Sequence, residues 1–309
     1  MFNLVQSLIA GIIRSNRPPG ERAPREAAPA VVSVDDIDPF QFSSHIEIAH
    51  GFPRVNWDAV DAWIETLPAE KSKGRARSLC ERAWLLHLLA PLGPQYHLSE
   101  GREGLLVSSL EPHVARATLD FMYGTLRRII KARDGLAFVP ALGKDILIVL
   151  DDQETYYNFV AHYYPERGEF AASGGMYINE GCRHFVTVKS EMRAIEPVIA
   201  HEMTHGCVAH LPLPLWLNEG IAVNMERRLT GIPPALYTPL ELHEQHLEFW
   251  GDAEVQEFWS GASFHRGGAS NTLSYDLARI LTEQLAKEWG SFKGFVGKAD
   301  REDAGKAAA

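Results

Sequence analysis

The sequence predicts an α+β protein in which a small mixed sheet packs against a helix that carries metal-ligand side chains. Short apolar runs of strand length, such as Asp145–Leu150, precede the segment 201–205, which reads HEMTH. Helical apolar periods dominate the chain after this segment and also residues 56–90. We therefore expect a central sheet, a mainly helical C-terminal part and a small helical N-terminal subdomain.

Composition excludes several classes of protein. The chain has 309 residues, of which 46% are hydrophobic and 23% charged, as in ordinary globular proteins. Its net charge of −10 argues against a general nucleic-acid binder, which usually shows a basic excess. The three cysteines provide no disulfide framework, so we expect a cytoplasmic protein.

Residues 1–34 are expected to form a disordered or anchoring N-terminal segment. The apolar run 2–13 is shorter than the ~20 residues of a membrane span, and we expect no stable span. Its arginines follow the run, whereas those of a secretory signal precede it. The run is compatible with a membrane-surface or docking helix. Residues 14–34 are rich in proline and charge and read as a linker.

Residues 35–92 are expected to form the helical N-terminal subdomain. Asn56 is a suitable N-cap for a helix over 56–67. A second helix is expected over 69–90, because Pro91 should end it. Because the chain is acidic, its basic run is interpreted as a solvated helix face: Lys71, Lys73, Arg75 and Arg77.

Residues 93–298 are expected to form the main domain, followed by a flexible tail over 299–309. The nearly continuous apolar run 145–150 is typical of a central strand that is buried on both faces. A four-residue loop between two short strands predicts a hairpin. In chain order we expect strands at 96–100 and 105–110, a helix at 112–133, the strand 145–150, a helix at 155–163, and strands at 174–179 and 183–188.

His201 and His205 lie four residues apart, so a helix presents both imidazoles on one face. A catalytic zinc site typically has three protein ligands and a water. Glu202 is turned about 100° from His201, so it can reach the water as a general base without binding the metal. Pro197 is expected at the first position of this helix, where a missing N–H is harmless.

The following segment supplies a third candidate ligand. Residues 214–222 read PLWLNEGIA and should open a second helix after a short connection, as in an αα-hairpin. Glu219 on that helix would add the carboxylate that a two-histidine zinc site lacks.

HEMTH followed by PLWLNEGIA resembles the gluzincin metallopeptidases, and its short spacing is most similar to the bacterial peptidase-MA-like domains. The resemblance is specific over 197–229 and weaker over about 96–295. It implies a zincin-like fold with an edge strand along the cleft, a part that either 174–179 or 183–188 would play. It also implies Zn²⁺ as cofactor with these roles: His201, His205 and Glu219 as ligands and Glu202 as general base.

One position departs from the family. Thermolysin-like enzymes carry an aspartate four residues after the ligand glutamate, where it supports the first histidine. Val223 occupies that position in this chain. The resemblance therefore leaves the partner of His201 unidentified, which bears on metal affinity and activity.

The C-terminal part is expected to hold a helix at 241–250, a loop at 258–265 and a helix at 271–289. Gluzincins commonly offer a tyrosine or histidine to the oxyanion across the cleft, and Tyr275 resembles that residue, with His265 as second choice. Equally, Tyr275 reads as a helix-start tyrosine with its hydroxyl in water. Four other residues of types that can bind metal are not expected to be ligands. His243 and His246 are interpreted as a solvated helix face, Cys207 as a buried residue and His184 as a surface residue.

The functional hypothesis is a zinc-dependent hydrolase of peptide bonds, acting on a peptide or protein substrate. Glu202 would take a proton from water, and zinc with Tyr275 would stabilise the oxyanion. Two alternatives remain open. One is a catalytically inactive zincin-fold binding or regulatory module, which Val223 favours. The other is a self-processing or highly specific regulatory protease.

Overall fold

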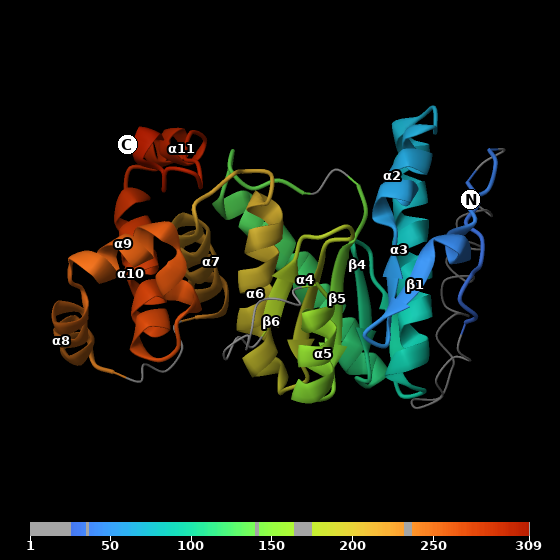
Figure 1. Cartoon of the computed structure of the whole chain (residues 1–309), viewed down its shortest axis with the longest axis horizontal. Helices are drawn as coiled ribbons and strands as arrows, with labels where there is room; N and C mark the ends of the chain where they lie inside the picture. Colours follow the sequence, from blue (N-terminus) through green and yellow to red (C-terminus); the bar gives the residue numbers. More distant parts are fainter. Residues whose placement is uncertain (1–25, 35–36, 140–141, 164–174, 232–236, 309) are drawn as a thin grey trace, which may run out of the picture.

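A computed structural model describes residues 26–34, 37–139, 142–163, 175–231 and 237–308 (Figure 1). The predicted N-terminal docking helix lies outside the described residues. A five-stranded mixed sheet stands in the middle of the molecule, with helices on both of its faces. The predicted α+β class is confirmed. In the described part, no helix is long and apolar enough to cross a membrane.

The sheet has the strand order β3-β4-β5-β7-β6. The inner strands β4, β5 and β7 are parallel, and the edge strands β3 and β6 are antiparallel to their neighbours. As predicted, β5 is central and buried after its first residue. Of the two candidates for the strand along the cleft, 174–179 corresponds to β6, which lies at an edge of the sheet. The other, 183–188, corresponds to β7, which lies inside the sheet. The bounds are β3 His97–Glu100, β4 Gly104–Ser108, β5 Asp145–Leu150, β6 Gly175–Ile178 and β7 His184–Val188.

One face of the sheet is covered by the N-terminal part of the chain. Asn56 caps α2, because its side-chain oxygen accepts a hydrogen bond from the Ala59 amide at 3.1 Å. The predicted end of α3 before Pro91 is wrong. The helix continues to Leu92, whose burial in this core offsets the weaker last turn. The elements are β1 (Ile46–Ala49), β2 (Phe52–Val55), α2 (Trp57–Glu65), α3 (Glu70–Leu92) and α5 (Gln153–Tyr163).

Arg77 corrects the interpretation of the basic run as a uniformly solvated face. Its buried guanidinium donates hydrogen bonds to Asp61, to Glu81 and to the Gly181 carbonyl at 2.6, 3.1 and 2.9 Å. It also lies over the Trp57 ring, 4.7 Å from the centroid. Gly181 belongs to the turn between β6 and β7, so Arg77 ties α3 to the sheet.

The other face of the sheet packs against α4 and α6, and the remaining helices extend from α6. The mainly helical C-terminal part is thus confirmed. In the described part, α8 has no buried residue and lies at the periphery. The helices are α4 (Pro112–Ala132), α6 (Met192–Val208), α7 (Leu215–Thr230), α8 (Pro239–Phe249), α9 (Asp252–Ser260), α10 (Ala269–Leu285) and α11 (Trp289–Val296).

The predicted start of the metal helix at Pro197 is wrong, because α6 begins at Met192 and holds the proline in its interior. A proline there removes one backbone hydrogen bond. Ile195 and Ile199, on either side of it, are buried in the core against α4, and this packing outweighs the lost bond.

The predicted loop at 258–265 is also wrong. Gly261, at a φ of 85°, ends α9, and a 3₁₀ helix, η3, follows at Ala262–His265. Phe258 and Phe264 are buried in the core, which explains why these turns are ordered. The predicted helix 271–289 corresponds to α10, which begins at Ala269 but ends at Leu285, and Trp289 begins a separate helix, α11.

Candidate metal site

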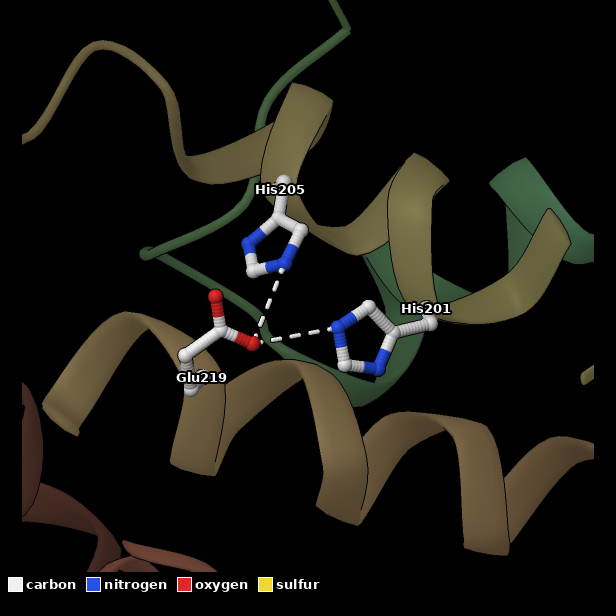
Figure 2. A group of neighbouring side chains, drawn as sticks. All are labelled: His201, His205 and Glu219. Carbon is white, nitrogen blue, oxygen red and sulfur yellow. Dashed lines mark hydrogen bonds and ion pairs between the residues drawn. The ribbon is translucent and has the colours of Figure 1, made fainter. Parts of the chain in front are cut away.

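The helices α6 and α7 form an αα-hairpin that places the candidate ligands face to face (Figure 2). His201 and His205 project from successive turns of α6 toward Glu219 on α7. Leu217 and Ile221 bury another side of α7 in the core, which fixes the direction in which Glu219 points.

The distances fit a tetrahedral metal ion. Glu219 Oε2 lies 3.2 Å from His201 Nε2 and 3.5 Å from His205 Nε2. The ligand atoms of the three residues all lie within 4.8 Å of one another. Tetrahedral coordination at about 2.0–2.2 Å would separate ligand atoms by about 3.3–3.6 Å. The two separations that involve Glu219 are therefore close to those of tetrahedral coordination, and the group could hold a metal ion.

A polar partner holds each histidine ring on the side away from the ligand atoms. His201 Nδ1 lies 3.1 Å from Glu226 Oε2, and His205 Nδ1 lies 3.0 Å from Asn218 Oδ1. Because a carboxylate and an amide oxygen accept hydrogen bonds, both Nδ1 atoms carry the proton, and each Nε2 is left for the metal.

Glu226 is the partner of His201, although Val223 occupies the position of the supporting aspartate of thermolysin-like enzymes. It stands seven residues after Glu219, two turns along the same face of α7, and so reaches His201 from farther down the helix. Glu226 and Asn218 are not among the residues predicted from the sequence. An acidic residue seven positions after Glu219 was the sequence signal that could have identified Glu226.

The charges of the site are coupled. Burial opposes a charge on Glu219, but the two histidines outweigh it and hold the pKa of the carboxyl well below its usual range. Burial likewise opposes a charge on His201, yet Glu219 and Glu226 raise its pKa well above the usual value. A cation at this centre would therefore replace protons on the histidines and meet a carboxylate that is already ionised.

Glu202 lies beside the three ligand residues but outside the ligand group. It is buried, and this burial raises its pKa although the neighbouring His201 and His205 act to lower it. The backbone of Tyr177, on the edge strand β6, also acts to lower the pKa of this carboxyl. Glu202 is thus close to the candidate ligands and to the edge strand β6.

Tyr275 lies next to the site on α10. The centroid of its ring is 6.4 Å from that of His201, and it packs edge-on against Phe264 at 5.3 Å. Burial raises the pKa of its hydroxyl above the usual value, and the carboxylates of Glu219 and Glu202 add to this effect. The hydroxyl therefore keeps its proton and can donate a hydrogen bond. His265, the second choice, is exposed in η3.

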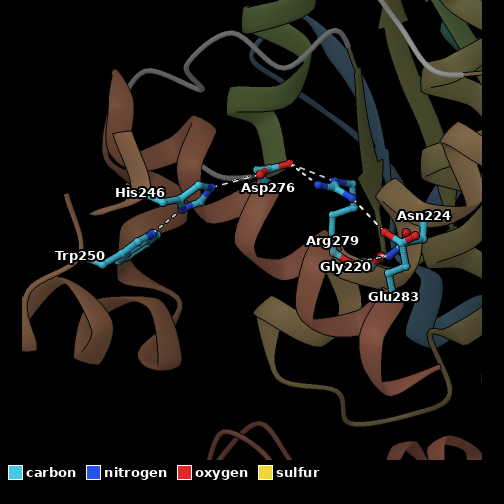
Figure 3. A network of polar contacts seen from close by, with 7 residues as sticks. All are labelled: Gly220, Asn224, His246, Trp250, Asp276, Arg279 and Glu283. Carbon is cyan, nitrogen blue, oxygen red and sulfur yellow. Dashed lines mark hydrogen bonds and ion pairs between the residues drawn. The ribbon is translucent and has the colours of Figure 1, made fainter. Parts of the chain in front are cut away.

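A chain of polar contacts fastens α10 to its neighbours (Figure 3). Asn224 on α7 donates to the Arg279 carbonyl, and the Arg279 guanidinium donates to Asp276. His246 Nε2 lies 3.1 Å from Asp276 Oδ2, and Trp250 Nε1 donates to His246 Nδ1. The interpretation of His246 as solvated is therefore wrong, because it joins α8 to α10.

The other residues of metal-binding type stand apart from the site. Cys207 is buried, as predicted, and is not in the ligand group. His184 is buried, which corrects its interpretation as a surface residue. It lies among the rings of Trp84, Phe159 and Tyr163, and its Nδ1 bonds to a backbone carbonyl.

No family model, curated protein or solved structure matches the chain. The class of site consequently rests on geometry. A buried His201–His205–Glu219 group on two packed helices is consistent with an HExxH…E, gluzincin-like metal site.

Proposed function

We propose that this chain is a zinc-dependent hydrolase of peptide bonds, with the metal held by His201, His205 and Glu219. The observation that carries the proposal is the three-residue ligand group with Glu202 buried beside it. A purely structural zinc usually has four protein ligands and needs no adjacent carboxylate. Three ligands and a neighbouring base are what a hydrolytic site requires.

When bound, zinc would supply a Lewis acid and lower the pKa of water toward ~7. Glu202 takes the proton of the attacking water and passes it to the leaving amine. Its burial favours this role, because a raised pKa brings the carboxylate closer to neutral pH. Tyr275, which keeps its proton, donates a hydrogen bond to the oxyanion.

The edge strand supports a peptide as the substrate. Among the described residues, β6 pairs only with β7, which leaves its other side available to a further strand. An extended peptide could add there through main-chain hydrogen bonds. The effect of the Tyr177 backbone on the pKa of Glu202 supports this role, because it indicates that the proposed general base lies near the strand on which the substrate would bind.

The test compares Glu202→Gln and His205→Ala with the unchanged chain by elemental analysis and by hydrolysis of a peptide library. We expect about one zinc per chain in the unchanged chain and in Glu202→Gln, and loss of zinc in His205→Ala. Turnover should fall about 10²–10⁴-fold in Glu202→Gln. Full zinc-dependent turnover in that variant would refute the mechanism.

Absence of metal from the unchanged chain, even after zinc is supplied, would refute the hydrolase proposal. A protein that binds zinc but cuts no peptide would instead favour the inactive binding or regulatory module.

A further inference from the structure

A buried cation lies outside the candidate metal site. Arg133 stands at the C-terminal end of α4 and is only 6% exposed. Among the described residues, its Nε has no hydrogen-bond partner, and no carboxylate pairs with the guanidinium. Buried charged groups are almost always paired, because burying one alone is costly. The Nε of Arg133 therefore lacks the hydrogen-bond partner that a buried polar atom usually has.

The charges around Arg133 make this imbalance larger. Burial and the positive charge of Arg228 lower the pKa of its guanidinium to about 10, which still leaves it protonated at neutral pH. Asp134, the next residue, is exposed and is not among the groups that act on Arg133. Within the described residues, the positive charge of Arg133 thus has no carboxylate to balance it, although the chain has a net charge of −10.

A second cation and an aromatic ring come from α11. The Arg133 guanidinium carbon lies 5.8 Å from the centroid of the Trp289 ring. Gly135, at a φ of 78°, leaves room for Lys293, whose Nζ lies 3.3 Å from the place that a Cβ at position 135 would take. Lys293 forms no ion pair with a carboxylate of the described part. Trp289 and Lys293 are four residues apart on α11, so the ring beneath Arg133 and the Lys293 side chain lie on one face of this helix, where α4 ends.

We propose that Arg133 and Lys293 bind a small oxyanion, a carboxylate or a phosphate, at the junction of α4 and α11. The planar guanidinium can hold two oxygens of such a group at once, and the Lys293 ammonium adds a point charge. The Trp289 ring face holds the guanidinium in place and leaves its edge for the ligand. The bound anion links the C-terminal helix α11 to α4.

The test measures the melting temperature of the zinc-loaded full chain during titration with inorganic phosphate or with acetate, at ionic strength held constant with sodium chloride. We expect a saturable rise with at least one of them, and the stronger one identifies the ligand as phosphate-like or carboxylate-like. Arg133→Met should weaken the apparent affinity about tenfold or more, and Lys293→Met should weaken it less. Arg127→Met, at an exposed position on α4, is the matched control and should leave the affinity unchanged.

An equal rise in Arg133→Met, or a rise that does not saturate, would mean an adventitious ion only and would overturn the proposal. No rise with either anion would overturn it as well. If Arg133→Met does not fold, Arg133→Lys keeps the charge and loses the planar fork. That variant should fold and bind the anion more weakly, and unchanged binding in it would refute the role of the fork.

Discussion

The two candidate histidine ligands have different partners, a carboxylate for His201 and a neutral amide for His205. We predict that Glu226→Gln weakens zinc binding about 10–100-fold, because the amide supports the imidazole less strongly than the carboxylate does. Competition with a chelating dye measures the affinity. Glu283→Gln, at an exposed position, is the control. An unchanged affinity in Glu226→Gln would show that Val223 leaves His201 without effective support.

Zinc binding should release protons near neutral pH. In the metal-free chain the pKa of His201 is raised well above its usual value, and that of His205 is raised as well. Both rings therefore hold a proton that the metal must displace, while Glu219 is already ionised. Zinc affinity should rise with pH between about 6 and 8. Calorimetry in buffers of different ionisation enthalpy counts the protons, and an affinity independent of pH would contradict the charge state inferred for the histidines.

The same pKa shifts affect the stability of the metal-free chain. The raised pKa of His201 adds stability that is fully present below its usual value near 6.5 and is lost as the pH rises through the folded-state pKa. The lowered pKa of Glu219 adds stability that is present above about 4.5 and is lost as the pH falls through the folded-state value. The pairing of His201 with Glu219 thus contributes most to the stability of the metal-free chain between about pH 4.5 and pH 6.5.

Spacing alone was enough to find the two candidate histidines, because i,i+4 residues share a helix face, whereas Glu219 was predicted from the helix that follows. Spacing could not find Glu226 or Asn218. Which residue meets each Nδ1 depends on how far α7 is shifted along α6, and this shift is set by packing of residues such as Leu217 and Ile221.

The crossing of α7 and α10 depends on a glycine next to the ligand Glu219. A Cβ at Gly220 would lie 2.1 Å from Thr282 Oγ1 and 2.4 Å from the Ala278 carbonyl oxygen. We predict that Gly220→Ala pushes α10 away and costs about 1–3 kcal/mol, as overpacking typically does. Tyr275, carried on α10, should move with it. Urea unfolding measures the loss.

Gly124 offers a matched control, because it lies inside α4 and a Cβ there would meet no atom within 4 Å. Gly124→Ala should raise the free energy of unfolding by about 0.5–1 kcal/mol, since alanine favours a helix. If both substitutions have the same effect, close contact at Gly220 does not determine how α10 sits on α7.

Most elements could be predicted from local signals, such as the apolar run of β5 and the Asn56 cap of α2. Two of the errors share a cause, because burial overrides a local preference in both. The turns around Phe258 and Phe264 are ordered by burial of these rings. The interior Pro197 of α6 is tolerated because its flanking isoleucines are buried.

At the scale of the whole molecule, the sheet separates two hydrophobic cores. The first core joins residues of α2 and α3, such as Val60 and Trp84, to sheet residues such as Ile148. The sequence could suggest a helical N-terminal subdomain, but it could not show this contact. Arg77 and Gly181 are 104 positions apart, and no local pattern predicts that they bond.

We predict that the helical part 35–92 does not unfold separately from the metal site. Trp84 is 1% exposed, donates to the Pro53 carbonyl and packs against the Trp57 and His184 rings. Trp84→Ala should lower the free energy of unfolding by about 3–5 kcal/mol, because it removes a large buried side chain. Zinc release should shift to the same lower urea concentration as the loss of helical circular dichroism.

Ile48→Ala, at a position that is 71% exposed on β1, is the control and should shift neither transition. The coupling follows from the sheet, since β5 and β7 supply side chains to both cores and β7 leads directly into α6. Loss of the first core would expose one whole face of these strands to water. Zinc that stays bound after the first loss of helical signal would show instead that residues 35–92 form an independent unit.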